Sequence, residues 1–105
     1  MKRIYYLSSC DTCRRMMKEF NRLDEFELID IKSANIDSKT LDFLKEKTGS
    51  HEVLFSKRAI KYKTLGLKDK NLSDQDFRQL ILDEYTLLRR PILIDGDNIL
   101  IGKLT

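Results

Sequence analysis

Two cysteines, Cys10 and Cys13, are the only thiols in this 105-residue sequence, and two residues separate them in the segment SSCDTC. A C-x-x-C pair can contribute half of a metal site, close a structural disulfide, lie buried and inert, or carry out thiol–disulfide chemistry. The rest of the chain decides how well each of these four interpretations is supported.

The chain offers few partners for a metal ion. A structural zinc site needs four ligands, and besides the cysteines the sequence contains one histidine, His51, which we expect to be exposed in a turn. A structural disulfide is disfavoured because so short a loop would stabilise the fold little and because such bonds are rare in cytoplasmic proteins. Two buried, inert thiols remain an alternative, since free cysteine is among the most buried residue types.

Strand and helix signals alternate around the pair. A β-rich run over residues 2–7 precedes a helix expected from about 11 to 23, whose apolar positions recur three and four residues apart. A second strand is expected over 26–31, and two more, over 92–95 and 98–101, flank a Gly-Asp-Asn turn typical of a hairpin. This order predicts an α/β protein with a mixed sheet made of a βαβ unit and a β-hairpin.

The segment between the second strand and the hairpin is expected to be helical. One helix should begin at residue 37 or 38, and Ser73 opens a capping-box pattern at the start of another. We therefore expect a single domain over residues 1–105 with a helical insert at about 33–85. A thioredoxin-type fold has this order and normally ends in a helix after its last strand. Since the sequence ends at GKLT, we expect that C-terminal helix to be absent.

The predicted strand-to-helix turn favours a redox-active pair. Unpaired N–H groups and the helix dipole at a helix N-terminus stabilise a thiolate, and Arg14 and Arg15 add positive charge in the first turn. Cys13 lies one turn further along, so its sulfur can approach that of Cys10. We expect the pKa of Cys10 to lie clearly below the value of about 8.5 for a free cysteine.

The only proline, Pro91, directly precedes the strand expected over 92–95, a position that tolerates a residue without a backbone donor. In thioredoxin-type folds a cis-proline occupies this place beside the active cysteine. We therefore expect Pro91 to be cis and Arg90 to point toward Cys10. An arginine there presents a planar fork of donors suited to an oxyanion.

The charge distribution and the hydropathy indicate which classes of binding partner suit this chain. The net charge is +3, and its surplus lies in one basic run without an acid, formed by Lys57, Arg58, Lys61 and Lys63. Such a patch suits a small anion, an acidic protein or solvent alone, and it is too thin to predict direct nucleic-acid binding. No apolar run approaches the roughly 20 residues that span a bilayer. The N-terminus is too quickly polar for a signal peptide, so we expect a cytoplasmic location without membrane binding.

The chain resembles the ArsC/Spx family over nearly its whole length, in IYYLSSCDTCRRMMKEF, FSKRAIKYKTLGL and LLRRPILIDGDNILIG. The resemblance implies a thioredoxin-like fold with an inserted helical lobe. One branch, the glutaredoxin-linked arsenate reductases, uses a first-position cysteine as the nucleophile on arsenate. The other branch, Spx, is a transcriptional regulator that binds the RNA polymerase α subunit and uses C-x-x-C as a disulfide switch.

The resemblance also implies roles for single residues. Cys10 matches the nucleophilic or sensing cysteine of both branches, whereas Cys13 matches a second cysteine that Spx has and the glutaredoxin-linked reductases typically lack. Arg90 matches an oxyanion-binding arginine of the reductases and also an arginine of Spx. Their earlier arginine is displaced by two residues to Arg58, as in Spx, and their last arginine is replaced by Lys103.

These observations together favour a thiol–disulfide redox enzyme similar to arsenate reductases, acting on a small oxyanion or a disulfide. Cys10 is expected to attack the oxyanion or disulfide, and Cys13 to resolve the intermediate. Arg90 is expected to stabilise the negative charge, with Pro91 as a structural residue at the site. The further candidates for substrate binding are Arg58, Lys103 and Arg14. We expect no bound cofactor or metal, and an external thiol reductant, glutathione with glutaredoxin or thioredoxin. The alternatives are an Spx-like redox-sensing regulator that binds the RNA polymerase α subunit, and a thioredoxin-like domain without activity.

Overall fold

The computed structural model describes residues 1–105 and contains a four-stranded sheet and four α-helices. The chain divides into two compact units. The sheet unit consists of Met1–Asn35 and Arg90–Thr105, and the helical unit consists of Ile36–Arg89. None of the helices is both long enough and apolar enough to cross a membrane.

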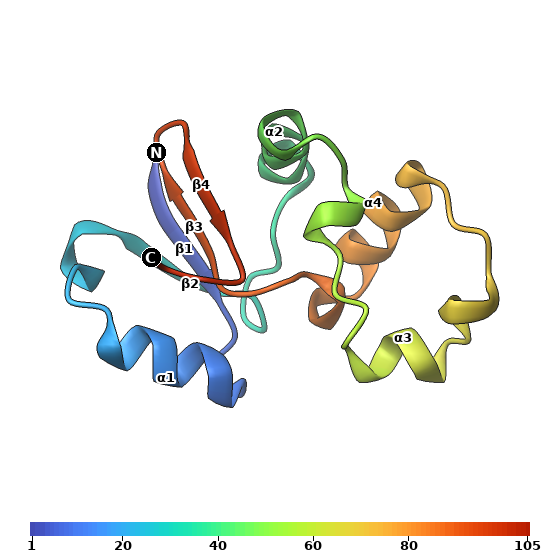
Figure 1. Ribbon diagram of the computed structural model, residues 1–105, viewed down its shortest axis with the longest axis horizontal. Helices are drawn as coiled ribbons and strands as arrows, with labels where there is room; N and C mark the ends of the chain where they lie inside the picture. The colour runs from blue at the N-terminus through green and yellow to red at the C-terminus, as the bar shows by residue number, and fades with distance from the viewer. The chain divides into compact units, whose positions relative to one another are not determined.

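The sheet unit contains all four strands, which are β1 (Lys2–Tyr6), β2 (Glu27–Asp30), β3 (Ile92–Asp95) and β4 (Asn98–Ile101) (Figure 1). They lie in the order β2-β1-β3-β4. β1 pairs in parallel with β2, and β3 is antiparallel to both β1 and β4. The mixed sheet predicted from the βαβ unit and the hairpin is therefore confirmed.

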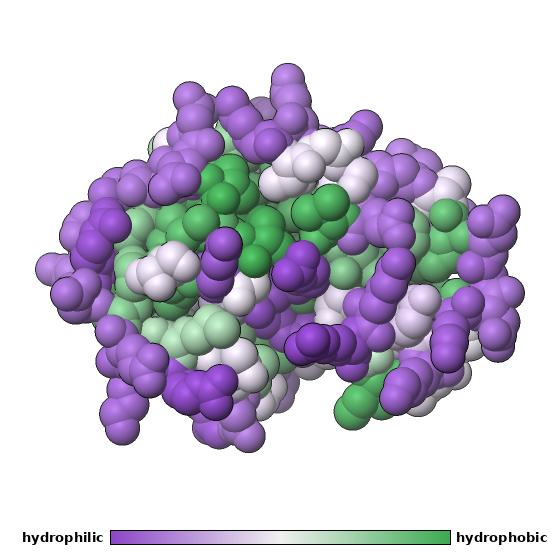
Figure 2. Space-filling view, viewed as in Figure 1, coloured by the Kyte–Doolittle hydropathy of each residue, from purple (hydrophilic) through white to green (hydrophobic).

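Helix α1 (Asp11–Glu19) connects the parallel strands and packs on one face of the sheet through Met16 and Met17. Both methionines contact a buried cluster that consists of Ile4, Phe20, Phe26, Leu93 and Leu104. β4 is an edge strand whose apolar side chains are partly exposed, and Figure 2 shows hydrophobic surface over this part of the sheet, among mostly polar side chains.

The predicted end of the first helix, at about Leu23, is wrong. α1 ends at Glu19, and the next residue, Phe20, is extended with φ −81° and ψ 123°. The Phe20 ring is buried and lies with its centroid 6.0 Å from that of Phe26, just before β2. Because this ring packs into the core of the sheet unit, tertiary burial overrides the local helical pattern at this point.

The helical unit contains α2 (Ser38–Thr48), α3 (Ile60–Thr64) and α4 (Asp74–Asp83). The predicted helix starts are confirmed. The side chain of Asp37 accepts a hydrogen bond from the Thr40 N–H at the start of α2, and both reciprocal bonds of the Ser73 capping box are present at the start of α4. Gly49 ends α2 with φ 105°, a left-handed conformation that glycine adopts without a steric penalty.

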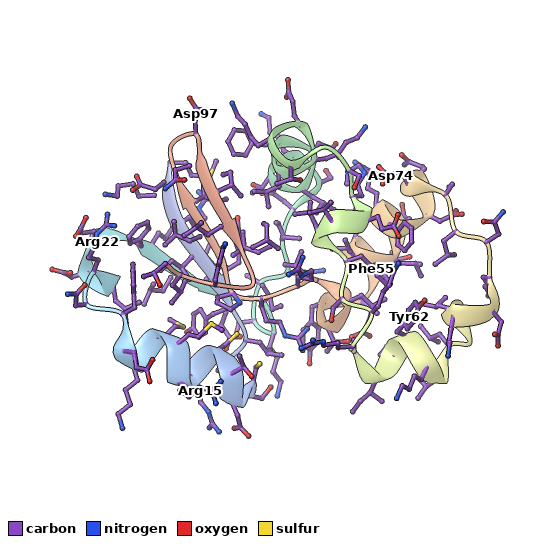
Figure 3. The ribbon with its side chains drawn as sticks, in the orientation of Figure 1. Arg15, Arg22, Phe55, Tyr62, Asp74 and Asp97 are labelled. Atoms are coloured by element: carbon purple, nitrogen blue, oxygen red, sulfur yellow. The ribbon has the colours of Figure 1, made fainter.

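Aromatic contacts join the segments of the helical unit. The ring of Phe55 packs against those of Phe77 and Tyr62, with centroid distances of 4.8 and 5.8 Å. Figure 3 shows Phe55 and Tyr62 turned toward each other. Phe55 also forms an isolated antiparallel bridge with Leu88. These contacts connect α3, α4 and the end of the helical unit in one core.

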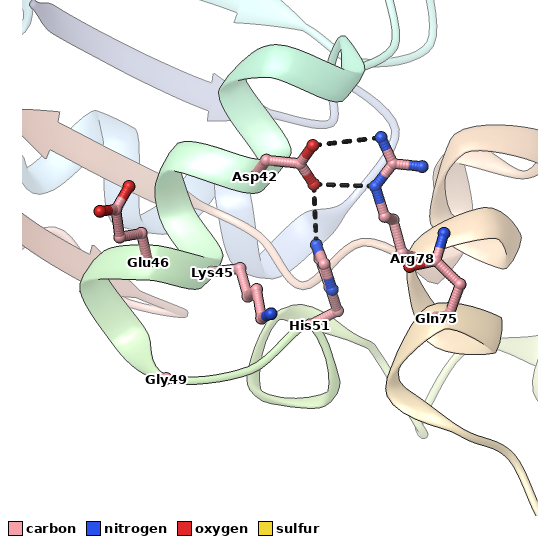
Figure 4. A pocket seen from close by; sticks show the side chains of 7 residues that line it. All are labelled: Asp42, Lys45, Glu46, Gly49, His51, Gln75 and Arg78. Atoms are coloured by element: carbon pink, nitrogen blue, oxygen red, sulfur yellow. Dashed lines mark hydrogen bonds and ion pairs between the residues drawn. The ribbon is translucent and has the colours of Figure 1, made fainter.

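The expectation that His51 is exposed is wrong, because only 3% of its surface is accessible. Its ring lies between two carboxylates, with Nδ1 2.9 Å from Asp74 Oδ2 and Nε2 3.0 Å from Asp42 Oδ1. Asp42 also accepts two hydrogen bonds from the guanidinium of Arg78 (Figure 4). The polar partners that permit this burial come from α2 and α4, which the local sequence around a turn cannot reveal.

Candidate functional site

The loop from Leu7 to Cys10 connects β1 to α1 at the carboxyl end of the parallel strands, where open α/β sheets commonly bind ligands. Cys10 is the N-cap residue of α1, as the sequence predicts, and it makes no side-chain capping bond. Its N–H donates to the Leu7 carbonyl at 3.0 Å, and its carbonyl accepts from the Arg14 N–H at 3.0 Å. The Cys10 sulfur is therefore held at the N-terminus of a helix, where a negative charge is stabilised.

The two thiols lie close together and differ in burial. Cys13, in the first turn of α1, is fully buried, whereas Cys10 is partly exposed. Both cysteines are free, and their closest approach is 3.8 Å. The Cys13 thiol is within range of a weak hydrogen bond to the Cys10 sulfur. Most of the sulfur atoms, yellow in Figure 3, lie along α1.

The pKa of Cys10 is lowered, in the direction that the sequence predicts. Partial burial by itself would raise this pKa. The backbone N–H and the thiol of Cys13 stabilise the thiolate by hydrogen bonding, and the guanidinium of Arg90 adds a hydrogen bond and an opposite charge. These contributions together outweigh burial, so Cys10 is the thiol that ionises more easily.

The pKa of Cys13 is raised to about 11. Burial is the main cause, and a backbone hydrogen bond from Leu7 opposes it only in part. The neighbouring Cys10 raises the Cys13 pKa further by its charge and hydrogen bond, while the charge of Arg90 lowers it. The pair therefore consists of one ionisable thiol at the surface and one protonated thiol beneath it.

The predicted cis peptide bond between Arg90 and Pro91 is confirmed. Pro91 is buried, and its carbonyl accepts a hydrogen bond from the Gly102 N–H at 2.7 Å. The Arg90 side chain reaches the sulfur of Cys10. The structure thus brings Cys10, Cys13 and Arg90 together from two distant parts of the sequence.

The other predicted cations lie in different environments. Arg14 is 64% exposed and forms an ion pair with Asp11. Arg15 projects from α1 away from the sheet (Figure 3). Lys103 lines a recess of about 280 Å³ beside Met16 and Glu19 of α1 and Phe20, which follows the helix. At 1.5 Å per residue, that end of the helix is roughly 13 Å along its axis from Cys10.

Arg58 belongs to the helical unit, where it is exposed in the turn before α3. The helical unit also contains an open polar recess of about 720 Å³, lined by Asp42, Lys45, Glu46, Gly49, His51, Gln75 and Arg78 (Figure 4). Several of these side chains already pair with one another. The structure contains no group of three or more His, Cys, Asp or Glu side chains arranged to hold a metal ion.

One residue at the active end of the sheet escaped the sequence reasoning. The Asp30 carboxylate accepts a hydrogen bond from the backbone N–H of Ser8, two residues before Cys10, at 3.3 Å. The available signal was an acid at the end of a strand expected to lie parallel to β1, where its side chain reaches the same edge of the sheet.

The chain is similar in sequence to one protein family and to several known proteins. The model of the ArsC family matches residues 5–104. The global transcriptional regulator Spx 2 of Bacillus anthracis is 31% identical over 106 residues, which cover 94% of this chain and 77% of that protein. The uncharacterized protein YusI of Bacillus subtilis is 28% identical over 102 residues, which cover 93% of this chain and 86% of that protein.

Among solved structures, a possible arsenate reductase from Streptococcus mutans UA159 is similar in fold and sequence. The TM-score is 0.81 at 31% identity, and the match covers 100% of this chain and 92% of that one. This similarity confirms the thioredoxin-like α/β fold with an inserted helical lobe. With a family match that spans almost every residue, the chain belongs to the ArsC family.

Proposed function

We propose that this protein is a thiol–disulfide redox enzyme of the arsenate reductase type, with Cys10 as the nucleophile and Cys13 as the resolving cysteine. The observation that carries the proposal is the asymmetry of the pair. Within 3.8 Å, the pKa of one thiol is lowered while that of the other is raised to about 11. A low-pKa thiol near the surface can attack the substrate as a thiolate. The protonated thiol beneath it can then attack the Cys10 sulfur of the intermediate.

With arsenate, the Cys10 thiolate forms a sulfur–arsenic bond, and an oxygen leaves arsenic as water after taking up protons. The Cys13 sulfur loses its proton to solvent and attacks the Cys10 sulfur, so that a disulfide forms and the sulfur–arsenic bond breaks. The electron pair of that bond stays on arsenic, which leaves as arsenite. Two thiols are oxidised and As(V) is reduced to As(III) by two electrons.

With a disulfide substrate, each sulfur attack releases one substrate thiolate instead, and the same Cys10–Cys13 disulfide forms. An external thiol, glutathione with glutaredoxin or thioredoxin, then reduces this disulfide. We also propose a cytoplasmic location, since a reducing thiol pool there returns the pair to its active state.

We propose that Arg90 stabilises the negative charge that develops on the substrate, because its side chain already contacts the attacking sulfur of Cys10. Arg58, Lys103 and Arg14 are secondary candidates for substrate binding. Arg14 is engaged by Asp11, and Lys103 lies beside the far end of α1. Arg58 belongs to the helical unit, where it is exposed.

The experiment is a coupled assay of arsenate-dependent NADPH oxidation, run once with glutathione, glutaredoxin and glutathione reductase and once with thioredoxin and its reductase. Turnover should disappear in Cys10→Ser. In the absence of an added thiol, Cys13→Ser should accumulate a covalent adduct at Cys10, detectable by mass spectrometry. No turnover above the Cys10→Ser control with either reductant would reject the arsenate assignment. A further assay with a small disulfide substrate then decides whether the thiol–disulfide function itself holds.

A second candidate function is a redox-sensing regulator like Spx. It is supported by the 31% identity to Spx 2 and by Cys13, which matches the second cysteine of the Spx pair. Pull-down of the RNA polymerase α subunit by oxidised and reduced protein tests it. Retention in either state, strongest in one of them, would support a regulator, and no retention in both states would exclude it.

A further inference from the structure

A carboxylate without a role in the proposed reaction lies at the active end of the sheet. Asp30 is the last residue of β2 and stands opposite Tyr6, the last residue of β1, in the parallel ladder. Its Oδ1 accepts hydrogen bonds from the backbone N–H of Ser8 at 3.3 Å and of Lys32 at 3.2 Å. The Ser8 side chain also hydrogen-bonds to this carboxylate. Asp30 therefore holds the loop that leads to Cys10.

The backbone around Asp30 is itself held in place. The Asp30 carbonyl accepts hydrogen bonds from the N–H groups of Ser33 and Ala34, both at 3.0 Å. The next residue, Ile31, donates its N–H to the Tyr6 carbonyl at 2.9 Å. The carboxylate is thus presented from an ordered turn at the end of a paired strand, so its bonds to Ser8 restrict the loop.

Leu7, the residue before Ser8, forms hydrogen bonds to both cysteines. The Leu7 carbonyl accepts the Cys10 N–H at 3.0 Å, and the backbone of Leu7 also hydrogen-bonds to the Cys13 sulfur. Leu7 is buried. The short segment Leu7–Ser8 is therefore attached to the thiol pair at one residue and to Asp30 at the other.

We propose that Asp30 is a positioning residue for the thiol pair: by holding Ser8, it keeps Leu7 in the place from which it bonds to Cys10 and Cys13. The inference rests on the proposed thiol–disulfide function. A positioning role can be separated from a simple effect of charge, because the two have opposite signs. The negative charge of Asp30 by itself opposes a thiolate at Cys10, whereas correct placement of the pair favours one.

The test is the rate of alkylation of Cys10 by iodoacetamide as a function of pH, with the modified residue identified by mass spectrometry. Asp30→Ala should raise the alkylation midpoint by about 0.5–1 pH unit, which slows the reaction below the midpoint roughly three- to tenfold. Asp30→Asn keeps an acceptor oxygen and should stay within about twofold of the native rate. Asp24→Asn, an equal change of charge just before the opposite end of β2, should leave the profile unchanged.

A native profile in Asp30→Ala, or a lowered midpoint in both Asp30 variants, would overturn the positioning role. Circular dichroism shows whether Asp30→Ala is folded. If it is not, Ser8→Ala takes its place: removal of the hydroxyl bond should raise the midpoint by a smaller amount, and no rise overturns the proposal. If Cys10 of the native protein alkylates like a free cysteine, the proposed function fails instead, whatever the variants do.

Discussion

Replacing His51 with alanine should destabilise the helical unit far more than an ordinary substitution in a turn. The ring is buried and connects α2 to α4 through Asp42 and Asp74, at 3.0 and 2.9 Å. Removing the ring breaks both contacts and leaves a gap among packed side chains.

The loss in the free energy of unfolding depends on which hydrogen bonds Asp42 and Asp74 retain once the His51 ring is removed. A hydrogen bond to a charged group contributes about 1.5–3 kcal/mol when it is well protected. Here the Asp42 and Asp74 side chains are 49% and 38% exposed, so solvent screens both contacts. Asp42 retains Arg78, and Asp74 retains the backbone N–H groups of residues 51 and 52. We expect a loss of about 2–3 kcal/mol in the free energy of unfolding, including the cavity.

The assay is urea unfolding followed by circular dichroism, together with thermal unfolding. The expected loss corresponds to a fall of roughly 10–20 °C in Tm for a chain of this size. His51→Gln can reach one of the two carboxylates, so it should lose less than His51→Ala. Hydrogen exchange should quicken in α2 and α4 more than in the strands of the sheet unit, because the ring connects those two helices.

A loss below about 0.5 kcal/mol in His51→Ala, the level of an ordinary surface substitution, would refute this reasoning. The same conclusion would follow if His51→Ala and Asp42→Asn were additive in a double-mutant cycle. Residues in direct contact should show a coupling of about 0.5 kcal/mol or more.

Three further predictions concern charge and helix capping. Arg90→Ala should raise the pKa of Cys10 by removing a hydrogen bond and a positive charge, and alkylation of Cys10 at pH 6–7 should slow several-fold; an unchanged pH profile would contradict the contact. Asp42 has a pKa lowered from 3.8 to about 2, mainly by Arg78 and against burial, so its stabilisation is complete above about pH 4 and is lost toward pH 2. Acid titration of Asp42→Asn should show a shallower loss than the native protein. Ser73→Ala should cost about 1 kcal/mol in urea unfolding, since the Asp76 N–H loses its acceptor at the start of α4, and a neutral result would contradict the capping box.

Much of the fold could be predicted from the sequence because its signals are local. The caps at Asp37 and Ser73 and the turn of the hairpin follow from the conformations that these residue types favour over a few neighbours. The strand-to-helix position of Cys10 follows in the same way. The cis bond before Pro91 was expected from the element order and the thioredoxin-type pattern, and the structure contains it.

Contacts between distant segments decided the rest. α1 ends at Glu19 because Phe20 packs against Phe26, and Lys103 lies beside the far end of that helix. The burial of His51 depends on carboxylates from other elements, and Asp30 meets the cysteine loop only because β1 and β2 pair in parallel.

The sequence by itself therefore determined the order of the elements, their caps and the residue types available for chemistry, since these depend on short-range preferences. Only the tertiary structure decided that Arg14 pairs with Asp11 and that Lys103 lies beside the far end of α1, whereas the contact of Arg90 with the Cys10 sulfur agrees with the prediction from the sequence. It also decided how strongly the two thiols differ, because burial, backbone donors and charge act through space and not along the chain.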